Sequence, residues 1–107
     1  ELIDVNATIC DLAGLDPQPD IDARSFRGVL DGATDEHRTE TVSVFRTFRL
    51  VRTRTHKLVE HFNDTTELYD LSQDPDEQRN CAQDDPETVQ RLGKRLKDRY
   101  QEGMWQR

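Results

Sequence analysis

Glu67-Leu68-Tyr69-Asp70-Leu71 runs directly into Ser72-Gln73-Asp74-Pro75, and Glu77 and Asn80 follow at fixed offsets from the Asp-Pro pair. The first five residues predict a short strand, because they are rich in apolar and aromatic side chains and are bounded by turn residues. The Asp-Pro pair predicts a turn, since Pro fixes its own φ and Asp bonds to nearby backbone amides. No catalytic chemistry requires this combination. The segment 67–80 therefore indicates an architectural element rather than a reactive site.

The residues before this segment also have strand character. β-Branched and aromatic residues predict strands at 41–45, 48–53 and 56–62, with a tight turn near 54–55. The connections are short, and short connections favour antiparallel pairing of consecutive strands. Together with the strand at 67–71, these residues predict a four-stranded antiparallel sheet.

A helix is predicted after the sheet, from Pro86 onward. Asp85 can accept hydrogen bonds from the first-turn amides, and Pro suits the first helical position. Apolar residues then recur at helical spacing: Val89, Leu92, Leu96 and Tyr100. We expect this helix to cover one face of the sheet and to end near Gly103.

Another helix is predicted at residues 2–13, with Gly14 as its C-terminal cap. One stripe of it is apolar and consists of Leu2, Val5, Ile9 and Leu12, widened by Ile3 and Ala13. The opposite stripe is polar and consists of Asp4, Thr8 and Asp11. A loop follows at 15–24, then a short helical turn from Ser25 to Leu30 that ends at Gly32. Residues 32–40 are polar, and we expect them to form a mobile loop.

Composition limits the partners of the chain. The 107 residues carry a net charge of -7, with a pI near 4.9, and only 33% of them are hydrophobic. The negative charge argues against nucleic acid and anionic membranes as partners. No apolar run approaches membrane length, and the start shows no signal-peptide pattern. The thin core predicts a subdomain that leans on a larger body, or an acidic protein with a strongly hydrated surface.

Several segments, in order along the chain, resemble motifs of the sulfatases. Asp4-Val5-Asn6-Ala7-Thr8 with Asp11-Leu12-Ala13-Gly14 resembles a helix written Asp-x-x-Pro-Thr…Leu-Ala-Gly, and 22–26 stands at a Gly-x-Ser-Leu turn. Residues 51–58 resemble a Val-Arg-Thr-x-x-x-Lys hairpin, and 67–80 resembles Glu-Leu-Tyr-Asp-Leu followed by Asp-Pro-x-Glu-x-x-Asn. Asp85-Pro86-Glu87 and its helix complete the set. The departures are Ala7 for Pro, Ala23 for Gly, and Cys81 where Leu commonly follows the Asn.

The resemblance implies a fold, a partner and cofactors. Sulfatases belong to the alkaline phosphatase superfamily and hydrolyse sulfate esters with calcium and a formylglycine made in a Cys-x-Pro-x-Arg type motif. Neither Cys10 nor Cys81 stands in that motif, and the metal-ligand segments of the family have no counterpart here. We therefore assign no catalytic, cofactor-binding or metal residue to this chain. One disulfide between the cysteines is possible, but we expect two buried free thiols, because free Cys behaves as a small apolar residue.

The predicted fold class is thus α+β: a four-stranded antiparallel sheet packed against a C-terminal helix, with an N-terminal helix from the truncated catalytic domain. We expect residues 1–32 to be the end of the catalytic domain and 33–107 to be a C-terminal subdomain. Glu1 has no Met before it, which is what a fragment would show. The expected partner is the sulfatase catalytic domain in the same polypeptide.

Histidines and charged clusters offer other sites, and each has a plainer interpretation. His56 and His61 have odd separation on one strand, so they point to opposite faces and do not share a metal. His37 and Arg38 lie in the polar loop and would approach a substrate pocket, but a solvated loop is the expectation. Acidic residues at 74–85 invite a calcium site but lack EF-hand spacing, so caps and turns explain them better.

A cationic run suggests anion binding: Arg46, Arg49, Arg52, Arg54 and Lys57. The run contains both odd and even positions, so its side chains are divided between the two faces of the sheet. This favours ordinary ion pairs with surface Asp and Glu. The cations of the last helix complement its dipole.

Three functions therefore remain open from the sequence. The first is a C-terminal subdomain of a sulfatase-like hydrolase, inactive alone, that supports the catalytic domain and shapes its substrate pocket. The second is a free-standing module that binds an anion or polyanion. The third is a small interaction domain that dimerises through the apolar stripe of its first helix.

Overall fold

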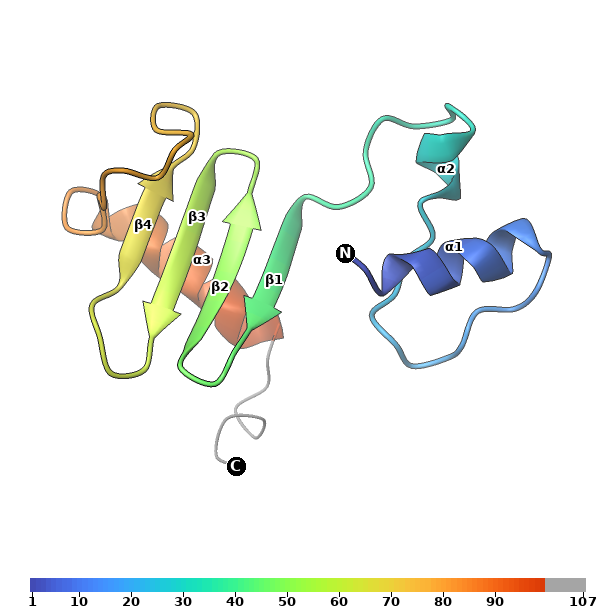
Figure 1. Ribbon diagram of the computed structural model, residues 1–107, viewed down its shortest axis with the longest axis horizontal. Coiled ribbons are helices and arrows are strands. Elements are labelled where there is room, and N and C mark those ends of the chain that lie inside the picture. The colour runs from blue at the N-terminus through green and yellow to red at the C-terminus, as the bar shows by residue number, and fades with distance from the viewer. Residues whose placement is uncertain (100–107) are drawn as a thin grey trace. The chain divides into compact units, whose positions relative to one another are not determined.

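The computed structural model describes residues 1–99, which contain helices α1 (Asp4–Leu12), α2 (Arg27–Leu30) and α3 (Pro86–Arg99) and strands β1 (Glu40–Val44), β2 (Phe48–Thr53), β3 (His56–His61) and β4 (Glu67–Asp70) (Figure 1). The chain divides into two compact units, one from Glu1 to Thr39 and the other beginning at Glu40. The boundary predicted at 32/33 concerns the domains of a longer protein, so it stays a prediction.

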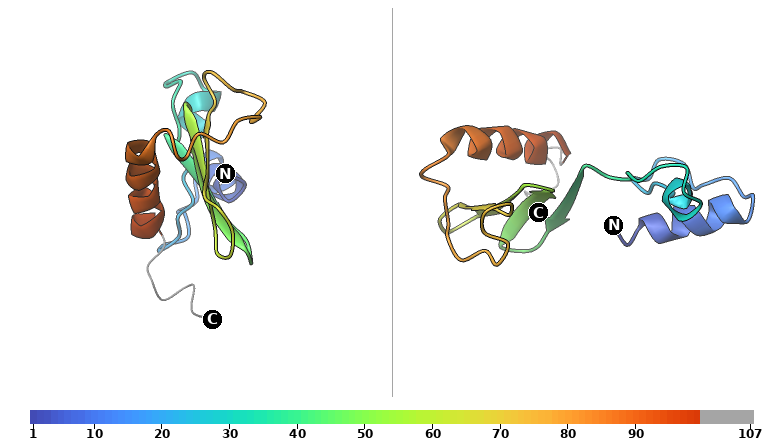
Figure 2. Two further views of the ribbon diagram at one scale, coloured as in Figure 1. Left: turned by 90° about the vertical axis from the view of Figure 1, so that its left-hand side faces the viewer. Right: turned by 90° about the horizontal axis from the view of Figure 1, so that it is seen from above.

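The second unit is the predicted α+β layer pair. Its four strands pair antiparallel in the order β1-β2-β3-β4, so every neighbour in the sheet is also a neighbour in sequence. Helix α3 lies along one face of this sheet (Figures 1 and 2). The predicted end of the helix near Gly103, and the core position of Tyr100, fall outside the described residues.

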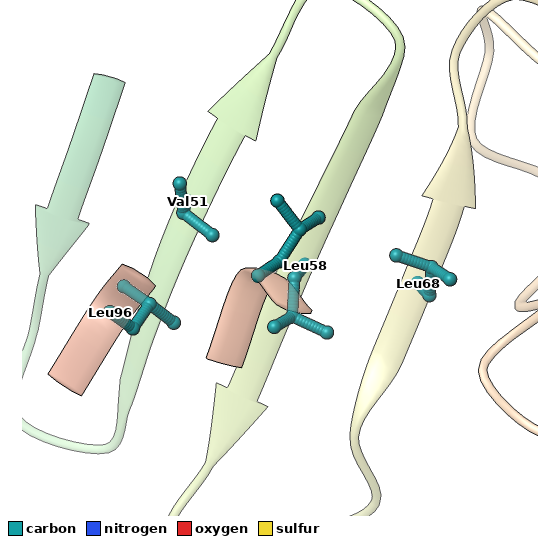
Figure 3. Packing of buried hydrophobic residues seen from close by; sticks show 5 residues of the cluster. Val51, Leu58, Leu68 and Leu96 are labelled. Carbon is teal, nitrogen blue, oxygen red and sulfur yellow. The ribbon is translucent and has the colours of Figure 1, made fainter. Parts of the chain in front are cut away.

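The strand register explains the core. Val42, Val51, Leu58 and Leu68 lie opposite one another across the four strands and so share the face toward α3. Leu92 and Leu96 of α3 pack onto this row. The completely buried residues are Val51, Leu58, Leu68, Leu92 and Leu96. Figure 3 shows Val51, Leu58 and Leu68 on three neighbouring strands, with Leu96 of α3 close by.

A glycine brings α3 close to the sheet. A Cβ at Gly93 would lie 2.9 Å from Oε1 of Glu60 on β3, so any side chain there forces the carboxylate to move. Movement of the Glu60 carboxylate would disturb a hydrogen bond, because its other oxygen accepts from Nε of Arg49, 2.6 Å away.

Local signals fix the ends of the helices. The α3 start has its predicted cap, since Oδ1 of Asp85 accepts from the amide of Thr88 at 3.1 Å. Gly14 takes a φ of 71° after α1 and ends that helix as expected. Helix α1 begins at Asp4, two residues later than predicted, because Leu2 and Ile3 form a turn in front of it. The predicted cap at Ser25 is displaced by one residue: α2 is preceded by Phe26, and Ser25 Oγ accepts from the amide of Arg27.

Candidate functional site

The first unit is organised around one buried carboxylate. Asp4 is completely buried, although it belongs to the polar stripe of α1. The guanidinium of Arg38 donates to both of its oxygens, Nε to Oδ2 and Nη2 to Oδ1, each at 2.6 Å. The amide of Arg24 donates to Oδ1 at 2.8 Å, and Nε2 of His37 lies 2.9 Å from Oδ2. Asp4 thereby joins α1 to two segments that are 20 and 34 residues away in sequence.

The electrostatics of this cluster favour the ionised carboxylate. The Arg38 guanidinium, helped by the Arg24 amide and by His37, holds the pKa of Asp4 far below its usual range, although burial opposes this. Asp4 in turn raises the pKa of Arg38, whose side chain is only 6% exposed. A bidentate arginine–carboxylate pair of this kind fixes the relative orientation of the two side chains and also neutralises their charges.

Thr8 extends the same buried face of α1. Its hydroxyl donates to the carbonyl of Asp4 at 2.7 Å and accepts from the amide of Phe26 at 3.0 Å. The ring of Phe26 then meets the ring of His37 edge to face, with 5.8 Å between centroids. The expectation of a mobile, solvated loop at 32–40 is therefore wrong for His37 and Arg38. Their partner Asp4 is too distant in sequence for any local pattern to indicate the contact.

The apolar stripe of α1 is exposed, unlike two residues of the polar stripe of the same helix. The polar residues Asp4 and Thr8 of this helix are buried, whereas four stripe residues are exposed: Leu2 (87%), Val5 (40%), Ile9 (61%) and Leu12 (57%). Ile3 and Leu15 beside the stripe are exposed as well. Within the first unit, then, the helix lies with its polar side inward. Large exposed apolar patches on proteins are frequent sites of contact with other molecules.

The segment 67–80 performs the architectural role expected of it. The Asn80 side chain accepts from the amides of Leu68 and Ala82, both at 3.0 Å, and donates to the carbonyl of Thr66 at 3.1 Å. Asp74 accepts from the amides of Gln78 and Arg79 at 3.0 and 2.9 Å. The bonds of Asn80 attach the turn to β4. The amides of Gln78 and Arg79 lower the pKa of Asp74.

The remaining candidates are also placed by the structure. His56 lies on the α3 side of the sheet and His61 on the other side, as predicted from their separation. The cationic run is divided as well: Arg49 lies under α3 with Glu60, and Lys57 lies on the opposite face with its Nζ 2.8 Å from Oε1 of Glu77. The interpretation as ordinary charge pairing is confirmed for these two residues.

The thiol of each cysteine lies near an oxygen atom in the described residues. Cys10 Sγ lies 3.5 Å from Oδ1 of Asn6, and Cys81 Sγ donates to the carbonyl of Leu68 at 3.2 Å. Both cysteines are free, as expected, but half-buried rather than buried. Within residues 1–99, no group of three His, Cys, Asp or Glu side chains is placed to hold a metal ion. No helix in the same range is long and apolar enough to cross a bilayer.

Comparison with known proteins agrees with the ordered motifs. The family model described as N-sulphoglucosamine sulphohydrolase, C-terminal, matches residues 1–105. The chain belongs to this family. It is the C-terminal region of a sulfatase, and the two units seen here are parts of that region. No curated protein gave a match.

Solved structures of larger proteins contain the sulfatase C-terminal fold. One is the BT33336S-sulf protein of glycosaminoglycan metabolism in Bacteroides thetaiotaomicron, with 25% identity and a TM-score of 0.74 over 89% of this chain and 24% of that one. Another is the phosphonate monoester hydrolase of Agrobacterium radiobacter, with 26% identity and a TM-score of 0.66 over 88% of this chain and 23% of that one.

A third structure, BT4656 in complex with its substrate D-glucosamine-2-N,6-O-disulfate, has 23% identity and a TM-score of 0.71 over 85% of this chain and 22% of that one. At that identity the likeness concerns the fold alone. The chain thus spans less than a quarter of each of these three structures.

Proposed function

We propose that this sulfatase C-terminal region is a supporting subdomain of a sulfuric ester hydrolase, that it is inactive by itself, and that it borders the substrate pocket of the intact enzyme. The observation that carries the proposal is the orientation of α1. A helix that buries Asp4 and Thr8 and exposes Leu2 and Ile9 has its apolar contact outside the first unit.

The expected occupant of that contact is the catalytic domain of the same polypeptide. The family match supports this choice, because the family is the C-terminal part of a larger sulfohydrolase. Coverage supports it too, because each solved relative contains more than three quarters of its chain beyond the matched part. Burying one Leu or Ile side chain contributes roughly 1.5–3 kcal/mol, so a stripe of four would hold the subdomain firmly.

The Asp4 cluster has a supporting role in this arrangement. By tying the segments at 24 and 37–38 to α1, it sets which side of the helix is presented outward. Arg38 and Asp4 offer no reactive group toward solvent, because they form an ion pair with each other and both side chains are buried. Calcium and the formylglycine nucleophile would have to be supplied by the catalytic domain.

The first test is an activity assay of the 107-residue chain alone, with an aryl sulfate and calcium. We expect no turnover above background, and turnover that copurifies with the chain would contradict the proposal. The second test replaces Ile9 by Asp in the intact enzyme and compares it with Lys94→Asp on α3. Ile9→Asp should lower the soluble yield and the activity, whereas Lys94→Asp should leave both unchanged.

The other two functions have less support. A polyanion-binding module would use the cationic run, but Arg49 and Lys57 of that run form ion pairs with Glu60 and Glu77. Dimerisation through α1 would use the same stripe as the catalytic domain, and it stays a prediction for the isolated chain.

A further inference from the structure

Aromatic side chains collect at one end of the sheet in the second unit. The β1–β2 turn and the β3–β4 loop both lie at this end (Figure 1). They are joined there, since the amide of Phe62 donates to the carbonyl of Thr47 at 3.0 Å. Phe45 and Phe62 are 59% and 47% exposed. We call Phe45, Phe48, His61 and Phe62 the aromatic end.

Three rings of the aromatic end, those of Phe45, Phe48 and His61, contact one another in series. The centroids of Phe45 and Phe48 are 5.7 Å apart with an interplanar angle of 33°, and those of Phe48 and His61 are 6.0 Å apart. Phe48 and His61 lie opposite each other in the register and on the face turned away from α3. Exposed aromatic rings on two adjoining loops provide broad apolar faces of the kind that a sugar ring can cover.

Oriented polar groups adjoin these rings. Oε2 of Glu67 is hydrogen-bonded to Nε2 of His61, and Oε1 accepts from the hydroxyl of Tyr69. Glu67 raises the pKa of Tyr69 to about 12, which keeps that phenol a donor. The His61 and Glu67 side chains remain 25% and 33% exposed. The network therefore presents a fixed carboxylate and imidazole to solvent beside the rings.

Arg46 supplies a cation at the same place. It lies in the β1–β2 turn next to Phe45, it is exposed, and no ion pair or hydrogen bond engages its side chain within residues 1–99. Arg52 and Arg54 of the cationic run share this state in the described part of the chain, whereas Arg38, Arg49 and Arg95 each have a carboxylate partner. What distinguishes Arg46 is its position in the turn beside Phe45. In an acidic chain an unpaired guanidinium is the feature that would bind an anionic group, because its planar donors match sulfate and carboxylate oxygens.

The geometry points to the aromatic end as a binding surface for an anionic sugar ring, with the ring stacked on Phe45 and Phe48, its sulfate or carboxylate on Arg46, and its hydroxyls on His61 and Glu67. The inference deepens the proposed function, on which the choice of a sulfated sugar rests. It concerns residues of the second unit, whereas the α1 stripe belongs to the first. Asp64, the acid of the β3–β4 loop, accepts hydrogen bonds from the amide and hydroxyl of Thr65.

The test is an NMR titration of the 107-residue chain with glucosamine 2-N,6-O-disulfate. Saturable shifts should be confined to signals of the aromatic end and Arg46. Glucosamine without sulfate should bind more weakly because it lacks the anion, and inorganic sulfate should bind more weakly because it lacks the ring. Shifts that never saturate, or equal affinity for inorganic sulfate, would overturn the inference.

Two variants with a matched control locate the site. Arg46→Gln should weaken binding about tenfold, the usual scale for losing a hydrogen bond between charged groups. Phe45→Ala should weaken it by a similar factor, since stacking area is lost. Arg54→Gln is the control, because Arg54 is equally exposed but lies in the β2–β3 turn at the opposite end of the sheet. Equal loss from Arg46→Gln and Arg54→Gln would mean unspecific charge attraction and would reject the site.

The intact enzyme separates this inference from the proposed function. There, Arg46→Gln should raise KM for the disulfate while kcat and soluble yield stay unchanged. A fall in yield instead would mean that the aromatic end packs on the catalytic domain, which contradicts a sugar site but leaves the supporting role intact. Conversely, turnover by the isolated chain would contradict the proposed supporting function, whereas the NMR titration would still test the sugar site.

Discussion

Asp4 is the residue on which the first unit depends. Its carboxylate accepts from Arg38, from the Arg24 amide and from His37, and it is fully buried. A buried charge is tolerated only where partners replace its hydration, and breaking such a pair leaves the other charge unpaired.

Asp4→Asn should therefore destabilise the first unit by about 3–5 kcal/mol, because Arg38 would lose its counter-charge inside the protein. Urea unfolding followed by NMR signals of Phe26 and His37 measures this. Asp16→Asn, an exposed residue in the loop after α1, serves as the control and should change stability by less than about 0.5 kcal/mol. Equal stability of the two variants would contradict the anchoring role.

The same residue sets a pH dependence. The folded state lowers the pKa of Asp4, so ionised Asp4 stabilises the fold fully above the unfolded pKa of about 4, and this contribution is lost as pH falls below it. The wild-type first unit should lose stability on acidification below about pH 4, with a steeper slope than Asp4→Asn. Parallel slopes in the two proteins would show that Asp4 does not carry this dependence.

Asn80 has a comparable role in the second unit, at the edge of β4. Asn80→Ala removes the acceptor for the amides of Leu68 and Ala82 and the donor to Thr66. We expect a loss of about 1–2 kcal/mol, measured by urea unfolding of the chain. Asn63→Ala, in the exposed β3–β4 loop, should have little effect. A smaller loss at Asn80 than at Asn63 would speak against the attachment of the turn.

At the scale of elements, α3 and the sheet hold the second unit together. Val51, Leu58 and Leu68 come into one row because the strand register places them opposite one another. Alternation along the strands and helical spacing in α3 are both visible in the sequence, and local patterns of this kind persist in the fold because they bury apolar surface.

Leu96→Ala tests this packing. The side chain is completely buried between α3 and the sheet, so its truncation should cost about 2–5 kcal/mol. Thermal unfolding monitored by far-UV circular dichroism gives the change. Lys94→Ala, on the exposed side of the same helix, should stay within about 0.5 kcal/mol of the wild type. A Leu96 variant as stable as the Lys94 variant would place the core elsewhere.

At the scale of the whole molecule, the apolar stripe of α1 is an apolar surface that the first unit leaves exposed. Its residues are exposed even though the sequence marks them as the buried side of a helix. An isolated chain with such a surface lowers its free energy by covering it, and a second copy is one way to do so.

The isolated chain should therefore associate reversibly at high concentration. The double variant Val5→Ser and Ile9→Ser should weaken this association, because both side chains belong to the stripe. Light scattering over a concentration series measures it, with Val29→Ser on α2 as an exposed apolar control. A strictly monomeric wild type would contradict self-association, while the supporting role would still be tested by Ile9→Asp in the intact enzyme.

The amino-acid sequence by itself determined the four strands, their antiparallel order, the start of α3 and the membership of the sulfatase family. The strands, their order and the helix start follow from alternation, turn residues and caps, each of which acts over a few neighbouring residues. The family follows instead from the resemblance of several motifs in order along the chain, which the family match bears out. Only the tertiary structure decided that Asp4 is buried with Arg38 and His37, that the stripe of α1 is exposed, and that the rings of Phe45, Phe48 and His61 come together. Such contacts join residues far apart in the chain, and their free energy depends on what the folded backbone brings together rather than on local spacing.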